Sequence, residues 1–197
     1  MQIVLASASP RRAELLQKIG LDFTVQAADV EENFDPSQNL ETQLENLALR
    51  KAWAVADTLN AGLVIGADTV VVIDGEVLGK PASSKEAALM LSRLSKRKHQ
   101  VLTGLAVIDV KTGKVISGVE STMVQFRALS PAEITAYVET GEPLDKAGAY
   151  GIQEKGATLV ERIEGCYFNV VGLPVARMVA MLKEAGLEVH RLWHHPF

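Results

Sequence analysis

The run Leu63–Ile73 is the part of the sequence that most constrains the fold. It reads LVIGADTVVVI, so only Gly66, Asp68 and Thr69 interrupt an apolar segment. A near-continuous apolar run of this kind is typical of a strand that is buried on both faces, as in α/β proteins. We therefore expect this strand to lie inside a sheet that helices flank.

Strand and helix signals alternate along the rest of the chain. Further strands are expected near residues 1–6, 23–25, 101–110, 115–127, 157–163 and 168–171. Helices are expected near residues 10–19, 40–59, 84–94, 131–139 and 174–185. Ser9-Pro10 and the capping boxes at Ser83 and Ser130 mark helix starts, and Asp74-Gly75 marks a hairpin.

These signals predict the fold class α/β with a mixed, twisted sheet, because hairpins occur beside the strand–helix alternation. The length of 197 residues suits one domain, or two small lobes around a cleft. No composition shift or linker marks a boundary, so residues 1–197 are expected to form a single functional domain.

The composition excludes several classes of protein. Hydrophobic residues make up 48% and charged residues 22% of the chain, which is typical of a globular protein. The net charge is -4 and no basic face stands out, so nucleic acid is not an expected partner. A single cysteine, Cys166, excludes an internal disulfide framework. The first residues do not resemble a signal peptide and no apolar run reaches about 20 residues, so a cytoplasmic protein without a membrane partner is expected.

Asp68 stands out because burying an unpaired charge inside an apolar strand is costly. Two interpretations are open. The carboxylate either accepts hydrogen bonds from nearby backbone amides, or is held rigidly at a cleft, where it could bind a metal or take a proton from water. Gly66 beside it would allow a close approach of backbone or ligand.

A second cluster comprises Ser7, Ser9, Arg11 and Arg12, between the first strand and the first helix. A helix N-terminus attracts phosphate through its free amides and its dipole, and arginine adds bidentate donors. The alternative is a solvated first turn. However, arginine is unfavourable near a helix N-terminus, so two arginines there indicate an anion between them.

Other polar residues are weaker signals when taken singly. Lys51, Lys80 and the pair Glu31-Glu32 each fit a solvated surface as well as a site. The segment DKAGAYGIQ at 145–153 is more unusual, because small spacers separate polar side chains as in a loop shaped around a ligand. Neither a Walker-type loop nor GxGxxG is present, which argues against P-loop NTPases, Rossmann cofactors and kinases.

Together these residues resemble the Maf family of nucleotide pyrophosphatases over nearly the whole chain. The motifs that carry the resemblance are LASASPRRAELL, DVEEN, GADTVVVIDGEVLGKP, DKAGAYGIQ and NVVGLP. Their number, order and spacing make the match specific, although any one of them alone would be weak. The resemblance implies an elongated α/β molecule with two lobes and a deep cleft, from a family that is often dimeric. It leaves a monomer and a homodimer open for this chain.

The resemblance also implies an activity and roles for individual residues. The activity is hydrolysis of a nucleoside triphosphate between the α- and β-phosphates with Mg²⁺, Mn²⁺ or a similar ion, as housecleaning of the nucleotide pool. The family's proton acceptor falls on Asp68, and a metal-associated acid falls on Glu32, with Glu31 left open. Phosphate-binding roles fall on four residues: Ser7, Arg12, Lys51 and Lys80.

The family divides by the base of its substrate. The positions that select the base in its dTTP/UTP branch match Arg11, Thr69 and Gln153. In the 7-methyl-GTP branch an aromatic residue, Gln and Glu tend to stand at these places. A neutral Gln amide can pair with a pyrimidine's carbonyl and N–H, whereas Glu suits a cationic methylated purine. All three positions therefore point to dTTP and UTP, or to a modified pyrimidine nucleotide.

The expected mechanism is direct attack of water on the α-phosphorus. Asp68 would orient and deprotonate the water, and a cation held by Glu32, with Asp68 either base or ligand, would neutralise phosphate charge. No covalent intermediate is expected, because neither Ser7 nor Cys166 has an evident base partner. Three alternatives remain: a pyrophosphatase for modified purine nucleotides, a nucleotide-responsive regulator of cell division, and a domain whose charges only form surface pairs.

Overall fold

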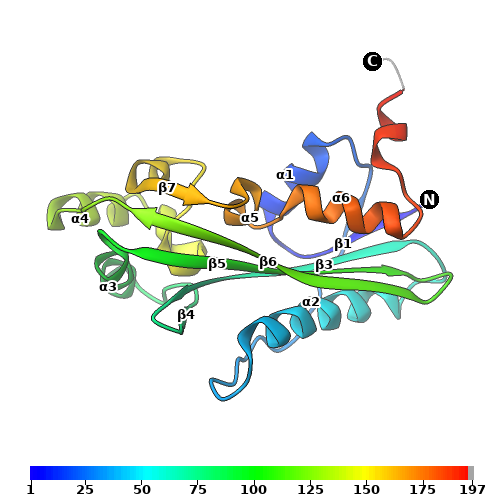
Figure 1. Ribbon diagram of the computed structural model, residues 1–197, viewed down its shortest axis with the longest axis horizontal. Helices are drawn as coiled ribbons and strands as arrows, with labels where there is room; N and C mark the ends of the chain where they lie inside the picture. Colours follow the sequence, from blue (N-terminus) through cyan, green and yellow to red (C-terminus); the bar gives the residue numbers. More distant parts are fainter. Residues whose placement is uncertain (195–197) are drawn as a thin grey trace. The chain divides into compact units, whose positions relative to one another are not determined.

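The structure is a computed structural model that describes residues 1–194 (Figure 1). Its strands form a seven-stranded sheet in the order β2-β1-β3-β5-β6-β7, with β4 paired to β3. The chain divides into two compact units. The first comprises Met1–Asp68, Thr103–Glu120 and the chain from Gly172 on, and the second comprises Thr69–Leu102 and Ser121–Val171. Strands β3 (Leu63–Ile73), β5 (Lys98–Asp109) and β6 (Lys114–Phe126) contribute residues to both units.

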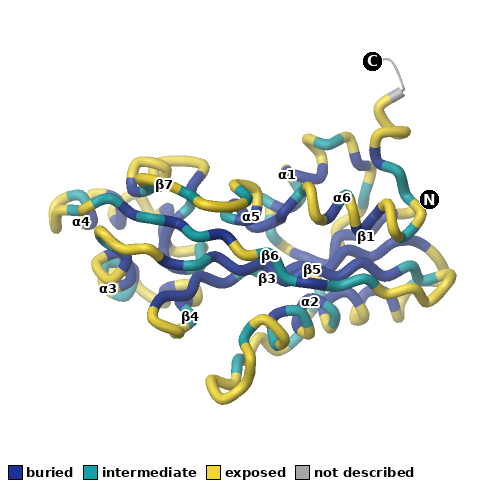
Figure 2. Tube along the Cα trace, viewed as in Figure 1, coloured by how far each residue is buried: buried dark blue, intermediate teal, exposed yellow. Residues whose placement is uncertain are grey.

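In the first unit, the short strands lie parallel to β3. Strand β1 (Ile3–Ala6) pairs in parallel with β2 (Thr24–Val25) and with β3. Three α-helices complete the unit: α1 (Pro10–Lys18), α2 (Leu40–Ala56) and α6 (Val175–Glu184). Helix α2 covers one face of the strands, and α1 and α6 cover the other (Figure 1). Because both faces are covered, the strand residues of this unit are largely buried (Figure 2). A 3-10 helix, η4 (Val189–His194), ends the described chain.

Two glycines let α2 pack unusually close to the sheet. A Cβ on Gly66 of β3 would lie 2.3 Å from the backbone oxygen of Ala48. A Cβ on Gly104 of β5 would lie 2.3 Å from the backbone oxygen of Leu44. The predicted close approach at Gly66 is therefore confirmed, with the backbone of a helix as the approaching group.

The second unit has its own core. Its elements are β4 (Glu76–Leu78), α3 (Ser84–Leu94), α4 (Pro131–Glu139), β7 (Val160–Glu164), α5 (Tyr167–Val171) and the 3-10 helices η1 (Glu142–Asp145), η2 (Ala147–Ala149) and η3 (Lys155–Leu159). Strands β3 and β4 are antiparallel, and so are β6 and β7. Helices α3 and α4 pack against each other, and their apolar faces join strand residues around the fully buried Phe126. Parallel and antiparallel pairs therefore coexist, which confirms the predicted mixed sheet flanked by helices.

Several local predictions are confirmed at the level of single residues. Asp74 and Gly75 join β3 to β4 with φ of 54° and 79°, the two positive values that a type I′ turn requires. The capping box of Ser130 and Glu133 is complete, with a hydrogen bond in each direction. None of the helices within residues 1–194 is long and apolar enough to span a bilayer.

Other local predictions are wrong. Residues 168–171 belong to helix α5, although their apolar and β-branched side chains predicted a strand. The side chain of Asn169 donates to the backbone oxygen of Val101 and to Thr122 Oγ1, so tertiary contacts override local propensity. Ser9 precedes α1 as expected but makes no side-chain cap bond. Ser83 Oγ accepts from Glu86 N, which is one bond of the predicted capping box. The Glu86 carboxylate, however, accepts from Ala82 N and not from Ser83 N, so the box is only half formed.

Candidate active site

The candidate site lies in the first unit, where β1 ends beside the middle of β3. Ala6 of β1 pairs with Gly66 of β3, so Ser7 and Asp68 both follow the last parallel pair of the two strands. Ser7 is buried, and the Asp68 side chain is 13% exposed. This is the carboxyl edge of the parallel strands, where open α/β sheets bind their ligands.

Arg12 is buried beside Ser7 in the first turns of α1. Its Nη1 donates to Ser7 Oγ at 2.9 Å, and its Nε donates to the backbone oxygen of Gly172 at 2.9 Å. Burial lowers the pKa of the Arg12 guanidinium, an effect that the charge of Asp68 opposes. Arginine still stays charged at neutral pH, so the edge of the sheet carries a fixed cation. Ser7 Oγ also accepts from Ser9 N, which leaves the hydroxyl hydrogen as its donor to a ligand.

Lys51 joins the carboxylates of this region. It is 6% exposed on α2, and its Nζ lies 2.6 Å from Asp68 Oδ1 and 2.5 Å from Glu32 Oε1. The close packing of α2 at Gly66 brings Lys51, three residues after Ala48, over Asp68 in the middle of β3. Asp68 is thus held by an ion pair with Lys51. One interpretation of the sequence predicted hydrogen bonds from backbone amides instead. The interpretation of Lys51 as a solvated lysine is wrong.

The structure separates the two adjacent acids. Glu32 reaches Lys51, although its side chain is 58% exposed, whereas Glu31 accepts from Asn33 Nδ2 at 2.5 Å. Glu32 is therefore the acid of the pair that joins the cluster. Its role with a metal stays a prediction.

Two carboxylates that converge on one ammonium group could also share a divalent cation. Mg²⁺ is commonly held through one or two carboxylates, with substrate phosphates and water completing its coordination. Within residues 1–194, no group of three or more His, Cys, Asp or Glu side chains could hold a metal.

The remaining predicted site residues are placed as follows. Arg11 is half-buried on α1, beside Arg12. Thr69 follows Asp68 on β3 and is half-buried, in the second unit. Lys80 and Gln153 are exposed residues of the second unit. The backbone nitrogen of Gly148 donates to the oxygen of Gly79, which joins the turn before Lys80 to the loop that leads to Gln153.

The sequence interpretation missed two features. The carbonyl of Gly172 fixes Arg12, and the only signal was the position of Gly172 in the NVVGLP motif. Glu142, close before the DKAGAYGIQ segment, is buried at 9% exposure and organises the following loop. A glutamate between Gly141 and Pro143 resembles a surface turn, so its burial gave no signal.

Known proteins resemble this chain over nearly its whole length. A family model described as Maf-like protein matches residues 2–185. A dTTP/UTP pyrophosphatase of Acetivibrio thermocellus is 50% identical over 196 residues, which cover 96% of this chain and 98% of the relative. One of Moorella thermoacetica is 53% identical over 188 residues, covering 95% of this chain and 97% of the relative. One of Methanosarcina barkeri is 52% identical over 189 residues, covering 95% and 96%.

Proposed function

Since the chain belongs to the Maf family, we propose that it hydrolyses dTTP and UTP to the monophosphate and pyrophosphate. The relatives that carry this name cover nearly the full chain at about half identity, as given above. The observation that carries the proposal is the charged cluster at the carboxyl edge of β1 and β3. There Asp68 and Glu32 share Lys51, and Arg12 lies buried beside Ser7.

The cationic side chains of the cluster would bind the triphosphate. The Arg12 guanidinium would bind phosphate oxygens through charge-assisted hydrogen bonds, and the Ser7 hydroxyl has its hydrogen to donate. The Lys51 ammonium is held between two acids, so it can donate to a phosphate without a large movement. Lys80 keeps its proposed role as a further phosphate contact.

Asp68 would orient a water molecule and take its proton as the water oxygen attacks the α-phosphorus. The bond between that phosphorus and the bridging oxygen breaks, and pyrophosphate leaves with both electrons of the bond. Positive groups near the leaving oxygens stabilise the charge that develops on them. Ser7 contacts an amide and a guanidinium, and neither is a base, so direct attack by water is proposed over attack by the serine.

A divalent cation, Mg²⁺ or Mn²⁺, forms part of the proposal, with Glu32 and Asp68 as its protein ligands. When bound, it would neutralise phosphate charge and lower the pKa of a bound water.

Arg11, Thr69 and Gln153 are proposed to select the base. The Gln153 amide can accept from N3–H of uracil or thymine through its oxygen and donate to a ring carbonyl through its nitrogen. Cytosine lacks that N3–H and carries an amino group in place of the C4 carbonyl, so an amide held in this orientation would disfavour CTP.

A product assay tests the proposal. UTP, dTTP, CTP, ATP, GTP and 7-methyl-GTP are incubated with the protein, with and without Mg²⁺ or Mn²⁺, and pyrophosphate is separated from phosphate. We expect metal-dependent release of monophosphate and pyrophosphate from UTP and dTTP. Turnover of 7-methyl-GTP alone would overturn the pyrimidine assignment while keeping the reaction. No turnover of any triphosphate by folded protein would overturn the enzyme and favour a nucleotide-responsive regulator.

A further inference from the structure

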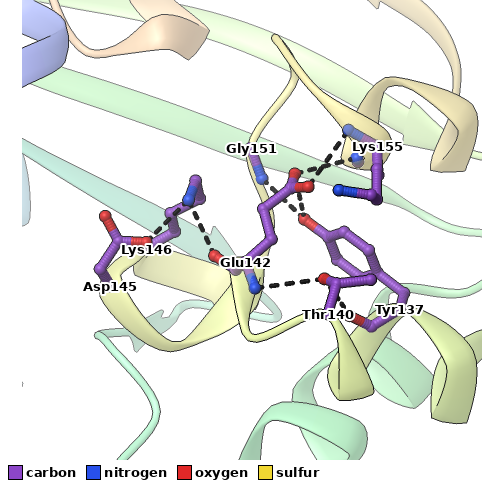
Figure 3. A network of polar contacts seen from close by, with 8 residues as sticks. Tyr137, Thr140, Glu142, Asp145, Lys146, Gly151 and Lys155 are labelled. Atoms are coloured by element: carbon purple, nitrogen blue, oxygen red, sulfur yellow. Dashed lines mark hydrogen bonds and ion pairs between the residues drawn. The ribbon is translucent and has the colours of Figure 1, made fainter.

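A buried polar network in the second unit surrounds the carboxylate of Glu142 (Figure 3). Glu142 Oε1 accepts from the Tyr137 hydroxyl at 2.9 Å and from Gly156 N at 3.0 Å. Glu142 Oε2 accepts from Lys155 N at 3.2 Å. All three donors are neutral groups, which is an unusual environment for a buried carboxylate.

The same network fixes both ends of the segment from Gly151 to Gly156. At one end, Gly151 N donates to the Tyr137 hydroxyl at 3.2 Å. At the other end, the amides of Lys155 and Gly156 donate to Glu142. The two ends also touch, because a Cβ on Gly156 would lie 2.2 Å from the Gly151 oxygen. Residues 152–155 therefore form a closed loop whose base is the Tyr137–Glu142 pair.

Lys146 adds a further support on the entering side of the loop. Its Nζ donates to the Glu142 backbone oxygen at 2.8 Å and to Asp145 Oδ1 at 2.7 Å. Its side chain lies over Gly151, where a Cβ would come within 2.6 Å of Cε. In Figure 3, Glu142 lies between Lys146 on one side and Tyr137 and Lys155 on the other.

Gln153 lies inside this closed loop, between the two fixed ends. It is exposed, whereas its neighbour Ile152 is buried and anchors the chain. Among residues 1–194, no group hydrogen-bonds to the Gln153 side chain, so the place of its amide depends on the backbone that carries it and on the side-chain torsions. The network that fixes that backbone therefore sets the region that the amide can reach.

We propose that Glu142, together with Tyr137, is a positioning residue for base selection and acts through the backbone of the Gln153 loop. This inference rests on the proposed function, because Gln153 is assigned there to the base. Neither residue is proposed to contact the substrate. A carboxylate suits the role because its two oxygens accept from three donors at once, which an amide at the same position does not do.

The test is a double-mutant cycle on the UTP-to-CTP ratio of kcat/KM. Glu142→Gln keeps the shape but presents an NH₂ group to backbone donors. We expect the ratio to fall about tenfold through a higher KM for UTP, with kcat nearly unchanged. In a Gln153→Ala background, Glu142→Gln should leave the ratio unchanged, because the amide that it positions is gone. An equal fall in both backgrounds, or an equal loss for UTP and CTP, would overturn the proposal.

Tyr137→Phe provides a second variant that retains the ring and removes only the hydroxyl. It should lower the ratio in the same direction, and Glu139→Gln, at the exposed end of α4, is the matched control that should not. Amide hydrogen exchange of Gly151 and Gly156 without nucleotide gives an independent readout. Faster exchange at these amides in Glu142→Gln is expected, and unchanged exchange would overturn the proposal.

The two hypotheses fail separately. If the wild-type protein releases no pyrophosphate from UTP or dTTP, the proposed function is overturned. The positioning role is then decided by the exchange rates and by the UTP-to-CTP ratio of dissociation constants. Those two quantities should change together in Glu142→Gln, and no change in either would overturn the role.

Discussion

The two units bury polar groups in opposite ways. The first unit buries cations, and its Lys51 is paired with the carboxylates of Asp68 and Glu32. The second unit buries the carboxylate of Glu142 among neutral donors and the imidazole of His99 beside Tyr150 and Phe126. Ion pairs at a partly open edge can exchange partners with a charged ligand. The Glu142 carboxylate accepts three hydrogen bonds from the chain itself and thereby holds the groups that donate them.

On this difference we base the proposal that the first unit carries the chemistry and that the second positions the loop of Gln153. Burying a charge is costly unless the charge is paired or hydrogen-bonded, so the buried charges of each unit call for a reason. In the first unit the reason is the anionic substrate of the proposed reaction. In the second unit it is the closed loop that contains Gln153.

The largest expected effect is that of Asp68→Asn, which keeps the shape of the side chain and removes its charge. We expect turnover to fall about 10²- to 10⁴-fold, because the amide accepts no proton from water. Pyrophosphate release and the circular dichroism spectrum measure activity and fold together. Asp57→Asn, at the exposed end of α2, is the matched control and should retain activity. Wild-type-like turnover by folded Asp68→Asn protein would break the assignment of chemistry to the first unit.

The next effect concerns stability in the second unit. Burial lowers the pKa of His99 from 6.5 to about 4, so the folded protein keeps this imidazole neutral where the unfolded chain protonates it. The contribution of the neutral His99 imidazole to the free energy of unfolding is complete above pH 6.5 and is lost as the pH falls towards 4. The total loss is about 3 kcal/mol. Denaturant unfolding of the wild type and of His99→Gln at several pH values measures it.

His99→Gln should show a smaller fall in unfolding free energy over that pH range, since its amide does not titrate. His190→Gln, at an exposed position, should follow the wild type. If the unfolding free energy changed equally with pH in the wild type and in His99→Gln, this imidazole would not be held neutral. The contrast between the units would then weaken.

The smallest expected effect concerns substrate specificity, which is proposed to depend on Gln153 of the second unit. Gln153→Glu removes the N–H donors of the amide, so we expect kcat/KM for UTP and dTTP to fall about tenfold. Steady-state kinetics with both substrates measures this. Gln17→Glu, on the exposed face of α1, controls for the added charge. Unchanged values for Gln153→Glu would show that Gln153 does not contact the base.

The sequence predicted the architecture well where a local pattern decides it. Apolar continuity identified β3, and the cost of a charge inside it singled out Asp68 before any geometry was known. The burial of Lys51 could not be predicted, because it depends on α2 packing against Gly66, a residue far from it in the chain. Choosing between Glu31 and Glu32 also required geometry, since the two are adjacent and chemically identical.

The failures at residues 168–171 and at Glu142 have a common cause. Local composition predicted a strand at the first and gave no sign of burial at the second. In both places hydrogen bonds to distant groups decide the outcome: Asn169 bonds to Val101, and Glu142 bonds to Gly156. Such contacts leave no periodic signal in the sequence.

Single-turnover hydrolysis of UTP in ¹⁸O-labelled water, with excess protein and the preferred divalent cation, tests the central claim most directly. Mass spectrometry of the products locates the labelled oxygen. Attack of water on the α-phosphorus predicts one ¹⁸O atom in the monophosphate and none in the pyrophosphate. Label in the pyrophosphate would contradict the account, because it means that water attacks the β-phosphorus. Monophosphate and pyrophosphate that are both unlabelled in the first turnover would also contradict it, because a carboxylate oxygen of the protein would then have attacked first.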